Sequence, residues 1–295
     1  MTMKEIKYID RKTNQPVIEK PPGERFLRFL YHHPLGRLPL ELLVRRRLLS
    51  SIYGRMMSRN RSIKRIQPFV DQYDIDMDEA VKPIDEFNSF NDFFYRELKP
   101  DIRDIDEGFV SPADGKIIAF EHIDAVGDFF VKGHQFTLEE FLQDKELAEK
   151  YQTGSMFIVR LAPNDYHRFH FPYGGHISEP TRISGRYYSV SPYALFKNFT
   201  KVFCGNEREY AILSTEDKGD VLLAPVGATM VGTIIETYEP DSEINKGDEM
   251  GYFAFGGSSM VILIEEGKIE IDEDLLRNTR NGMETSIRMG ERIGG

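Results

Sequence analysis

The chain has 295 residues, of which 40% are hydrophobic, and its formal net charge is −10 at pH 7. This length fits one large domain or two small ones and is sufficient to bury a sizeable core. The single cysteine, Cys204, excludes an internal disulfide and favours a reducing compartment. No uninterrupted apolar run reaches about 18 residues, and the N-terminus has no apolar core, so we expect neither a transmembrane helix nor a signal peptide.

Charge is distributed unevenly, because residues 24–66 carry eleven Lys and Arg residues against two acids. Leucine and phenylalanine lie among these charges at helical spacing, which is typical of helices that lie in an anionic membrane interface. The alternative is an ordinary amphipathic helix packed on the protein. Binding to nucleic acid is disfavoured because the rest of the chain is acidic. Pro34 and Pro39 divide this basic segment (residues 24–66) into two or three short helices.

Local signals predict a linker and two helices further along the chain. Residues 71–85 are acidic and rich in turn-forming residues, so we interpret them as a linker. Residues 89–98 predict a short helix capped by Ser89 or Asn88. The capping box Thr137-Leu-Glu-Glu140 begins a second helix that extends to about residue 150.

From residue 109 onward, short β-branched runs separated by Gly, Pro and Asp predict a strand-rich domain. The predicted strands are 116–120, 155–161, 221–224, 229–237 and 260–265. We therefore expect an α+β fold in which an antiparallel β core, resembling a sandwich or flattened barrel, follows N-terminal amphipathic helices. The last twenty or so residues are rich in Arg, Asn, Gly and Glu, and we expect them to be partly disordered.

Two motifs supply candidate catalytic side chains. Pro112-Ala-Asp-Gly115 contains Asp114, although such a motif on its own more often forms an Asp-Gly turn between two strands. Tyr166-His-Arg-Phe-His-Phe-Pro172 contains His167 and His170. Residues three apart in a regular strand point to opposite faces, so the two histidines reach one site only from an irregular loop, or else they serve two surfaces. A metal site at this pair is disfavoured, because no partner ligands have convincing spacing.

The tetrapeptide Gly256-Gly-Ser-Ser259 between two apolar runs is the most informative motif. Glycine permits positive φ and leaves the Gly257 carbonyl unshielded, so the Ser258 hydroxyl can attack its own preceding peptide bond. Such a tetrapeptide is more often a plain turn. Together with Asp114 and His170, however, Ser258 completes the set in which a carboxylate orients a base and the base activates a hydroxyl.

Taken in order, these motifs resemble those of the phosphatidylserine decarboxylase family over roughly residues 85–265. Other segments that match the family's pattern are residues 90–100, 131–138, 205–208 and 226–232. One departure concerns the cleavage motif, which commonly reads Leu-Gly-Ser-Thr in the family and reads Gly-Gly-Ser-Ser here. This difference bears on the rate of cleavage more than on cleavage itself.

The resemblance implies a pyruvoyl-dependent carboxy-lyase that is made as a self-cleaving proenzyme. Cleavage between Gly257 and Ser258 would give chains 1–257 and 258–295, with Ser258 converted into the pyruvoyl group. This group would form a Schiff base with phosphatidylserine, release CO2 and leave phosphatidylethanolamine. The implied roles are Asp114, His170 and Ser258 as the self-cleavage triad and His167 as the proton donor in decarboxylation.

The resemblance also implies where the protein acts and with what. Residues 1–85 would associate with an anionic membrane, and residues 86–295 would form the catalytic domain. The two chains of one precursor would stay together, and such units would form a homo-oligomer at the cytoplasmic face of the cell membrane. We expect no metal and no nucleic acid.

Two other functions would use some of the same residues. A serine hydrolase would keep the chain intact, but its Gly-x-Ser-x-Gly motif is absent because Met260 stands at the second glycine. Segments 226–232 and 246–251 are also similar to lipoyl and biotinyl carrier modules. Such a carrier needs a lysine between small residues at a hairpin tip, which the sequence lacks.

Overall fold

The computed structural model describes residues 6–19, 54–123, 136–186, 188, 200, 202–227, 234–254 and 258–295. Within these ranges the largest element is a sheet of eleven strands. In order across the sheet they are β12 (Ser242–Ile244), β7 (Gly175–Ile177), β9 (Arg208–Ser214), β10 (Asp220–Gly227), β14 (Ser258–Ile264), β5 (Ser155–Leu161), β4 (Gly115–Phe120), β15 (Glu284–Ile287), β1 (Lys7–Asp10) and β2 (Gln15–Ile18), with β8 (Thr181–Ile183) beside β9.

Two smaller sheets accompany the large one. One contains β11 (Ile234–Glu236), β13 (Glu249–Phe253) and β6 (Arg168–His170), and the other contains β16 (Arg292–Gly294) and β3 (Phe109–Val110). The pairing of β1 with β15 is parallel, whereas the strands around the centre of the large sheet pair antiparallel. The α+β class and the antiparallel core are therefore as predicted.

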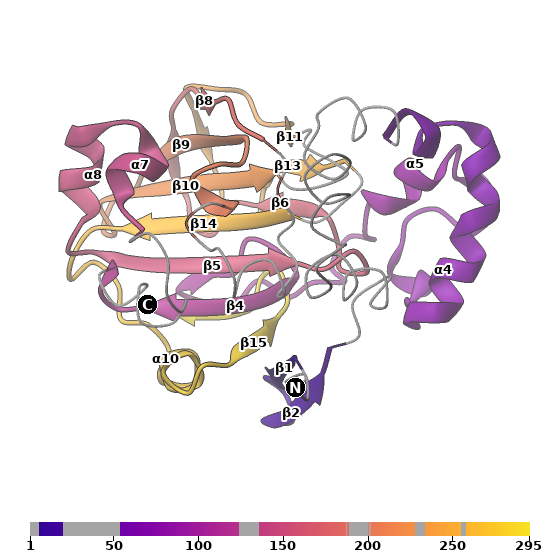
Figure 1. The fold of residues 1–295 in the computed structure, drawn as a ribbon, viewed down its shortest axis with the longest axis horizontal. Coiled ribbons are helices and arrows are strands. Elements are labelled where there is room, and N and C mark those ends of the chain that lie inside the picture. The colour runs from indigo at the N-terminus through magenta and orange to yellow at the C-terminus, as the bar shows by residue number, and fades with distance from the viewer. Residues whose placement is uncertain are drawn as a thin grey trace, which may run out of the picture.

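The helices lie at different places around the sheet. α7 (Leu138–Leu142) and α8 (Lys145–Tyr151) are at one end of the molecule, and α4 (Ile66–Tyr73) and α5 (Phe90–Phe94) are at the other (Figure 1). α10 (Glu273–Arg280) lies near β15 and β4. Short 3-10 helices η3 (Asn60–Arg65), η4 (Met77–Glu79) and η5 (Ile84–Glu86) complete the N-terminal helical part. No helix among the described residues is long and apolar enough to cross a membrane.

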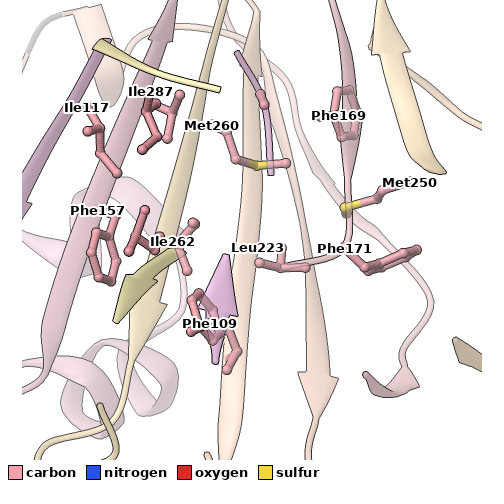
Figure 2. Packing of buried hydrophobic residues seen from close by; sticks show 14 of the residues in the cluster. Phe109, Ile117, Phe157, Phe169, Phe171, Leu223, Met250, Met260, Ile262 and Ile287 are labelled. Carbon is pink, nitrogen blue, oxygen red and sulfur yellow. The ribbon is translucent and has the colours of Figure 1, made fainter. Parts of the chain in front are cut away.

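Side chains of the central strands alternate between two hydrophobic clusters, as expected for the two faces of a sheet. In β14, Val261 and Leu263 join the cluster that contains Phe141 of α7. Met260 and Ile262 point to the other face, where they pack in a cluster with Phe109, Phe157 and Phe169 (Figure 2). Both faces of β14 are thus covered, and all seven of its residues are buried.

The N-terminal helical part has its own hydrophobic cluster, formed by Met57, Ile66, Val70, Phe87, Phe90, Phe93 and Phe94. Residues 24–53 of the basic segment lie outside the described residues. Its remaining part, 54–66, is packed, because Met57, Ser62 and Ile66 are buried. The predicted linker 71–85 contains the end of α4, the whole of η4 and the start of η5, and it contacts the rest of the protein through the Glu79–Arg103 ion pair.

Both predicted helix caps are confirmed, but both helices are shorter than expected, since α5 ends at Phe94 rather than at residue 98. The Ser89 and Thr137 hydroxyls accept hydrogen bonds from the backbone N–H groups of Asp92 and Glu140, at 3.1 and 3.2 Å. The prediction of one helix to about residue 150 was wrong, because the chain turns at Gln143, which has a φ of +53°. Asp144 then caps the separate helix α8.

The expected disorder at the C-terminus was also wrong. The last residues form α10, β15 and β16, and β15 pairs with both β4 and β1. Leu275, Ile287 and Ile293 are buried in the same cluster as Met260. Of the predicted strands, 155–161 has the observed bounds of β5, whereas β14 begins two residues before the predicted start. In segment 229–237 the described part is β11.

Candidate active site

Strand order brings the predicted site residues to one edge of the large sheet. β5 runs antiparallel to both β4 and β14, so the end of β5 lies beside the starts of β4 and β14. Asp114 immediately precedes β4, Ser258 begins β14, and the segment with both histidines follows β5. A backbone hydrogen bond of 2.8 Å from His170 N–H to the Pro112 carbonyl joins the two motifs directly.

Ser258 is enclosed at the start of the central strand. It pairs with Leu161 of β5 and Gly227 of β10, and it is 1% exposed. Because side chains alternate along a strand, its hydroxyl lies on the face of Met260, which is the face that packs against β6 and β13. Its Oγ has no hydrogen-bond partner among the described residues. Gly257, the predicted cleavage partner, lies outside them.

His170 is held by hydrogen bonds at both ring nitrogens. Its Nδ1 is 2.9 Å from the Gly247 carbonyl, and its Nε2 is 3.1 Å from the Tyr166 hydroxyl. A carbonyl oxygen can only accept, so Nδ1 carries the hydrogen and Nε2 accepts from Tyr166. Burial lowers the pKa of His170, while nearby Glu249 and Asp114 act in the opposite direction. The lowered pKa favours a neutral imidazole, and its basic nitrogen, Nε2, accepts a hydrogen bond from the Tyr166 hydroxyl.

The Asp114 carboxylate is fixed by groups other than histidine. It accepts hydrogen bonds from Arg103 Nη2 and from the Met289 backbone N–H, each at 2.8 Å. Arg103 also contacts Glu79 at 2.8 Å and so links the helical part to the sheet. These bonds hold the negative charge of Asp114 near His170, although no hydrogen bond joins the two side chains.

His167 lies in different surroundings from His170. It is fully buried, its Nδ1 is 2.8 Å from the Asp165 carbonyl, and its ring centroid is 3.9 Å from that of Phe94. His167 precedes β6, whereas His170 ends it, and Phe169 between them packs into the core. The chain that joins the two histidines is strand β6 rather than an irregular loop, so the rings serve different environments, which is the second of the two expected alternatives.

The elements that carry the four predicted residues thus meet at one edge of the large sheet, but the three residues of the predicted triad do not contact one another through hydrogen bonds. Among the described residues, no hydrogen bond connects Asp114, His170 and Ser258 to one another. Within the same ranges, no cluster of three or more His, Cys, Asp or Glu side chains suits a metal ion. The roles given to these residues remain hypotheses.

Sequence reasoning missed several residues that support the site. Asn206 donates to the Gly227 carbonyl at 2.8 Å and thereby holds β10 beside Ser258. The fully buried Arg208 donates to the carbonyls of Phe141 and Asn206. Both residues lie in the matched segment 205–208, which could have directed attention to them. The Arg103–Glu79 contact has no such local signal, because it joins residues far apart in the chain.

Comparisons with known proteins agree on one family. The family profile described as phosphatidylserine decarboxylase matches residues 90–295. Phosphatidylserine decarboxylase proenzyme from Fusobacterium nucleatum is 53% identical over 100% of this chain and 99% of its own length. The proenzymes of the same name from Desulfitobacterium hafniense strain Y51 and Clostridium novyi are 47% and 45% identical, and each alignment covers 98% of this chain and 98% and 99% of the relative.

The Tyr166–His170 hydrogen bond predicts how His170 titrates. Tyr166→Phe removes the donor to neutral Nε2, a bond worth about 1 kcal/mol, so the pKa of His170 should rise. The measurement is an NMR titration of the imidazole signals. Tyr151→Phe is the matched control, because its hydroxyl contacts the Asp220 carbonyl elsewhere in the structure. An unchanged His170 titration in Tyr166→Phe would contradict the assigned tautomer.

Proposed function

The chain belongs to the phosphatidylserine decarboxylase family, and we propose that it is a proenzyme that cuts itself between Gly257 and Ser258 and then decarboxylates phosphatidylserine. One observation carries this proposal beyond the family match. Ser258 Oγ, like Ser259 Oγ beside it, is buried without a hydrogen-bond partner among the described residues, although buried polar groups normally have partners and an unpaired one is costly. Of the two serines, only Ser258 directly follows the Gly257 carbonyl. A hydroxyl that is consumed to make a ketone needs no permanent partner, so the residue fits conversion into a pyruvoyl group.

In the proposed cleavage, Ser258 Oγ attacks the carbonyl carbon of Gly257, and the peptide C–N bond breaks as the ester bond forms. The hydroxyl proton ends on the freed amino nitrogen of residue 258. β-Elimination then removes the Cα proton and breaks the bond between Cβ and Oγ, which leaves Gly257 as a carboxylate. The remaining dehydroalanine takes up one water and loses ammonia, so that chain 258–295 begins with a pyruvoyl group.

His170 is the proposed proton acceptor in this cleavage. Its lowered pKa keeps the ring neutral, and Nε2 then retains the lone pair that a base requires. Tyr166 occupies Nε2, so its hydroxyl has to turn away before His170 takes a proton. The Asp114 carboxylate favours the transient imidazolium through its charge, and Arg103 and the Met289 N–H keep that carboxylate in place.

His167 is the proposed proton donor in turnover. The pyruvoyl group would supply an electron sink for the electrons left when CO2 departs. The bond from His167 Nδ1 to the Asp165 carbonyl fixes the ring orientation, and the transferred proton would come from Nε2 of the protonated ring. Burial of this ring against Phe94 excludes water from one side of it.

We expect Ser258→Ala to remain a single uncut chain without decarboxylase activity, because the attacking hydroxyl is gone. Intact mass under denaturing, reducing conditions distinguishes one chain from two. Ser259→Ala, which alters the neighbouring buried serine, should still yield chains 1–257 and 258–295. Cleavage of Ser258→Ala would refute the nucleophile, and an uncut but active parent protein would favour a serine hydrolase.

The two histidines should separate cleavage from turnover. His170→Ala and Asp114→Ala should stay uncut, whereas His167→Ala should be cut and then lose about 10²–10⁴-fold in decarboxylation rate, the usual contribution of acid–base catalysis. Mass measurement reports cutting, and release of CO2 from phosphatidylserine reports turnover. A cut His167→Ala protein with normal turnover would remove His167 from this role.

We also propose that the protein binds peripherally to the cytoplasmic face of the membrane and that cleaved units form a homo-oligomer there. Deleting residues 24–53 should weaken binding to anionic vesicles, since each Lys or Arg near such a surface contributes about 1 kcal/mol. The deletion stops before Met57, Ser62 and Ile66 because these residues are buried. Vesicle sedimentation at low and high salt is the measurement, with neutral vesicles as control. Equal, salt-insensitive binding after the deletion would contradict the interfacial interpretation.

A further inference from the structure

A cavity of about 350 Å³ adjoins the candidate site on the side of Asp114. Its walls come from β1, the end of α4, the start of β4, β15 and the loop after β5. Asp114 and Tyr166 belong to these walls, whereas Ser258, His167 and His170 do not. The cavity is therefore next to the proposed cleavage site but separate from Ser258.

Arg96 is the unusual residue of this cavity. It is 8% exposed and lines the cavity, and its Nε is buried without a hydrogen-bond partner among the described residues. Among those residues no carboxylate forms an ion pair with its guanidinium. Its Cζ lies 5.2 Å from the centroid of the Phe93 ring. Burial lowers the pKa of Arg96, but an arginine keeps its charge in proteins. Among the described residues no carboxylate pairs directly with Arg96, although the charges of Asp114 and Glu79 act on it. A buried charge without a direct partner is unfavourable.

Three other cations of the wall already have carboxylate partners. Arg103 contacts Asp114 and Glu79, each at 2.8 Å. Lys116 contacts Asp165 at 2.9 Å, and Arg288 contacts Glu79 at 3.3 Å. The carboxylates nearest Arg96, those of Asp114 and Glu79, are thus bound by other arginines. Because these neighbouring acids are bound by other cations, no described carboxylate pairs directly with Arg96, and an anion from solution would fill this place.

We propose that this cavity binds a phosphate group and that Arg96 is its anchor. The planar guanidinium donates two parallel hydrogen bonds to an oxyanion, which is the preferred geometry for phosphate. Besides the three carboxylates that pair with these cations, the lining contains Asp10, Asp74, Asp76 and Glu291, which would repel a larger polyanion. A phosphate ester that also carries an amine suits both the arginine and the carboxylates, whereas a free phosphate suits Arg96 alone. The site does not depend on the role proposed for Ser258.

The test is calorimetric titration of the full-length Ser258→Ala protein with inorganic phosphate, glycerophosphoethanolamine and glycerophosphoserine at constant ionic strength. We expect saturable binding, and Arg96→Met should weaken it about tenfold or more because charge-assisted bonds are lost. Arg182→Met removes a half-exposed arginine outside the cavity and should change binding less than about twofold. Tighter binding of the esters identifies a lipid headgroup as the source, and tighter binding of inorganic phosphate identifies the free ion.

Absence of binding by all three probes, or full binding by Arg96→Met, would overturn the proposal. If Arg96→Met does not fold, crystals of the protein with Arg96 intact can be soaked in selenate, whose anomalous signal locates the anion. A selenate within hydrogen-bond distance of the Arg96 guanidinium supports the site, and an empty cavity refutes it. If Ser258→Ala proves to be cut, the proposed nucleophile fails, while the phosphate titration keeps its meaning.

Discussion

The antiparallel pairing of β14 with β5 and β10 is the constraint on which the candidate site depends. Each of its seven residues has a partner in both neighbouring strands, from Ser258 to Ile264. This register decides which face every side chain of β14 occupies. A slip of one residue would move the Ser258 hydroxyl to the face of α7 and α8, away from β6 and β13. The two buried clusters oppose such a slip, because every side chain of the strand would then face the other cluster, in which it does not fit.

Around this strand, buried ion pairs connect distant parts of the chain to the same edge. Arg160 of β5 contacts Glu19 at 2.7 Å and Glu284 of β15 at 2.6 Å. Arg103 similarly connects Glu79 with Asp114. Removing one member of a buried pair leaves an uncompensated charge, so these contacts are costly to break. The N-terminal hairpin, the helical part and the C-terminal strands are thereby all held against β4 and β5.

Local features of this fold could be predicted from sequence, whereas long-range ones could not. The caps at Ser89 and Thr137 and the bounds of β5 follow from short patterns whose physical cause lies within a few residues. The break at Gln143 requires a left-handed backbone conformation, and the sequence has no glycine at this position that would predict it. Order at the C-terminus depends on pairing of β15 with β1 and β4, which composition does not report.

The same division applies to the candidate site. The motifs contained Asp114, His167, His170 and Ser258, and the fold gathers the elements that carry them. The motifs did not reveal that the Tyr166 hydroxyl would donate to His170 or that Arg103 would donate to the Asp114 carboxylate. These contacts depend on side-chain placement in three dimensions. Which arginine is left without a partner likewise depends on every other charge in the cavity.

The central place of β14 bears on the lifetime of the protein. Residues 258–295 contribute β14 and β15 to the large sheet and β16 to a smaller one, each paired with strands from before residue 257. A cut at Ser258 would therefore leave the short chain woven into the long one. If that product unfolds, two separate chains have to find each other again, which the intact precursor never has to do. Folding would accordingly have to precede such a cut, and the persistence of a cut protein would be governed by how slowly it unfolds.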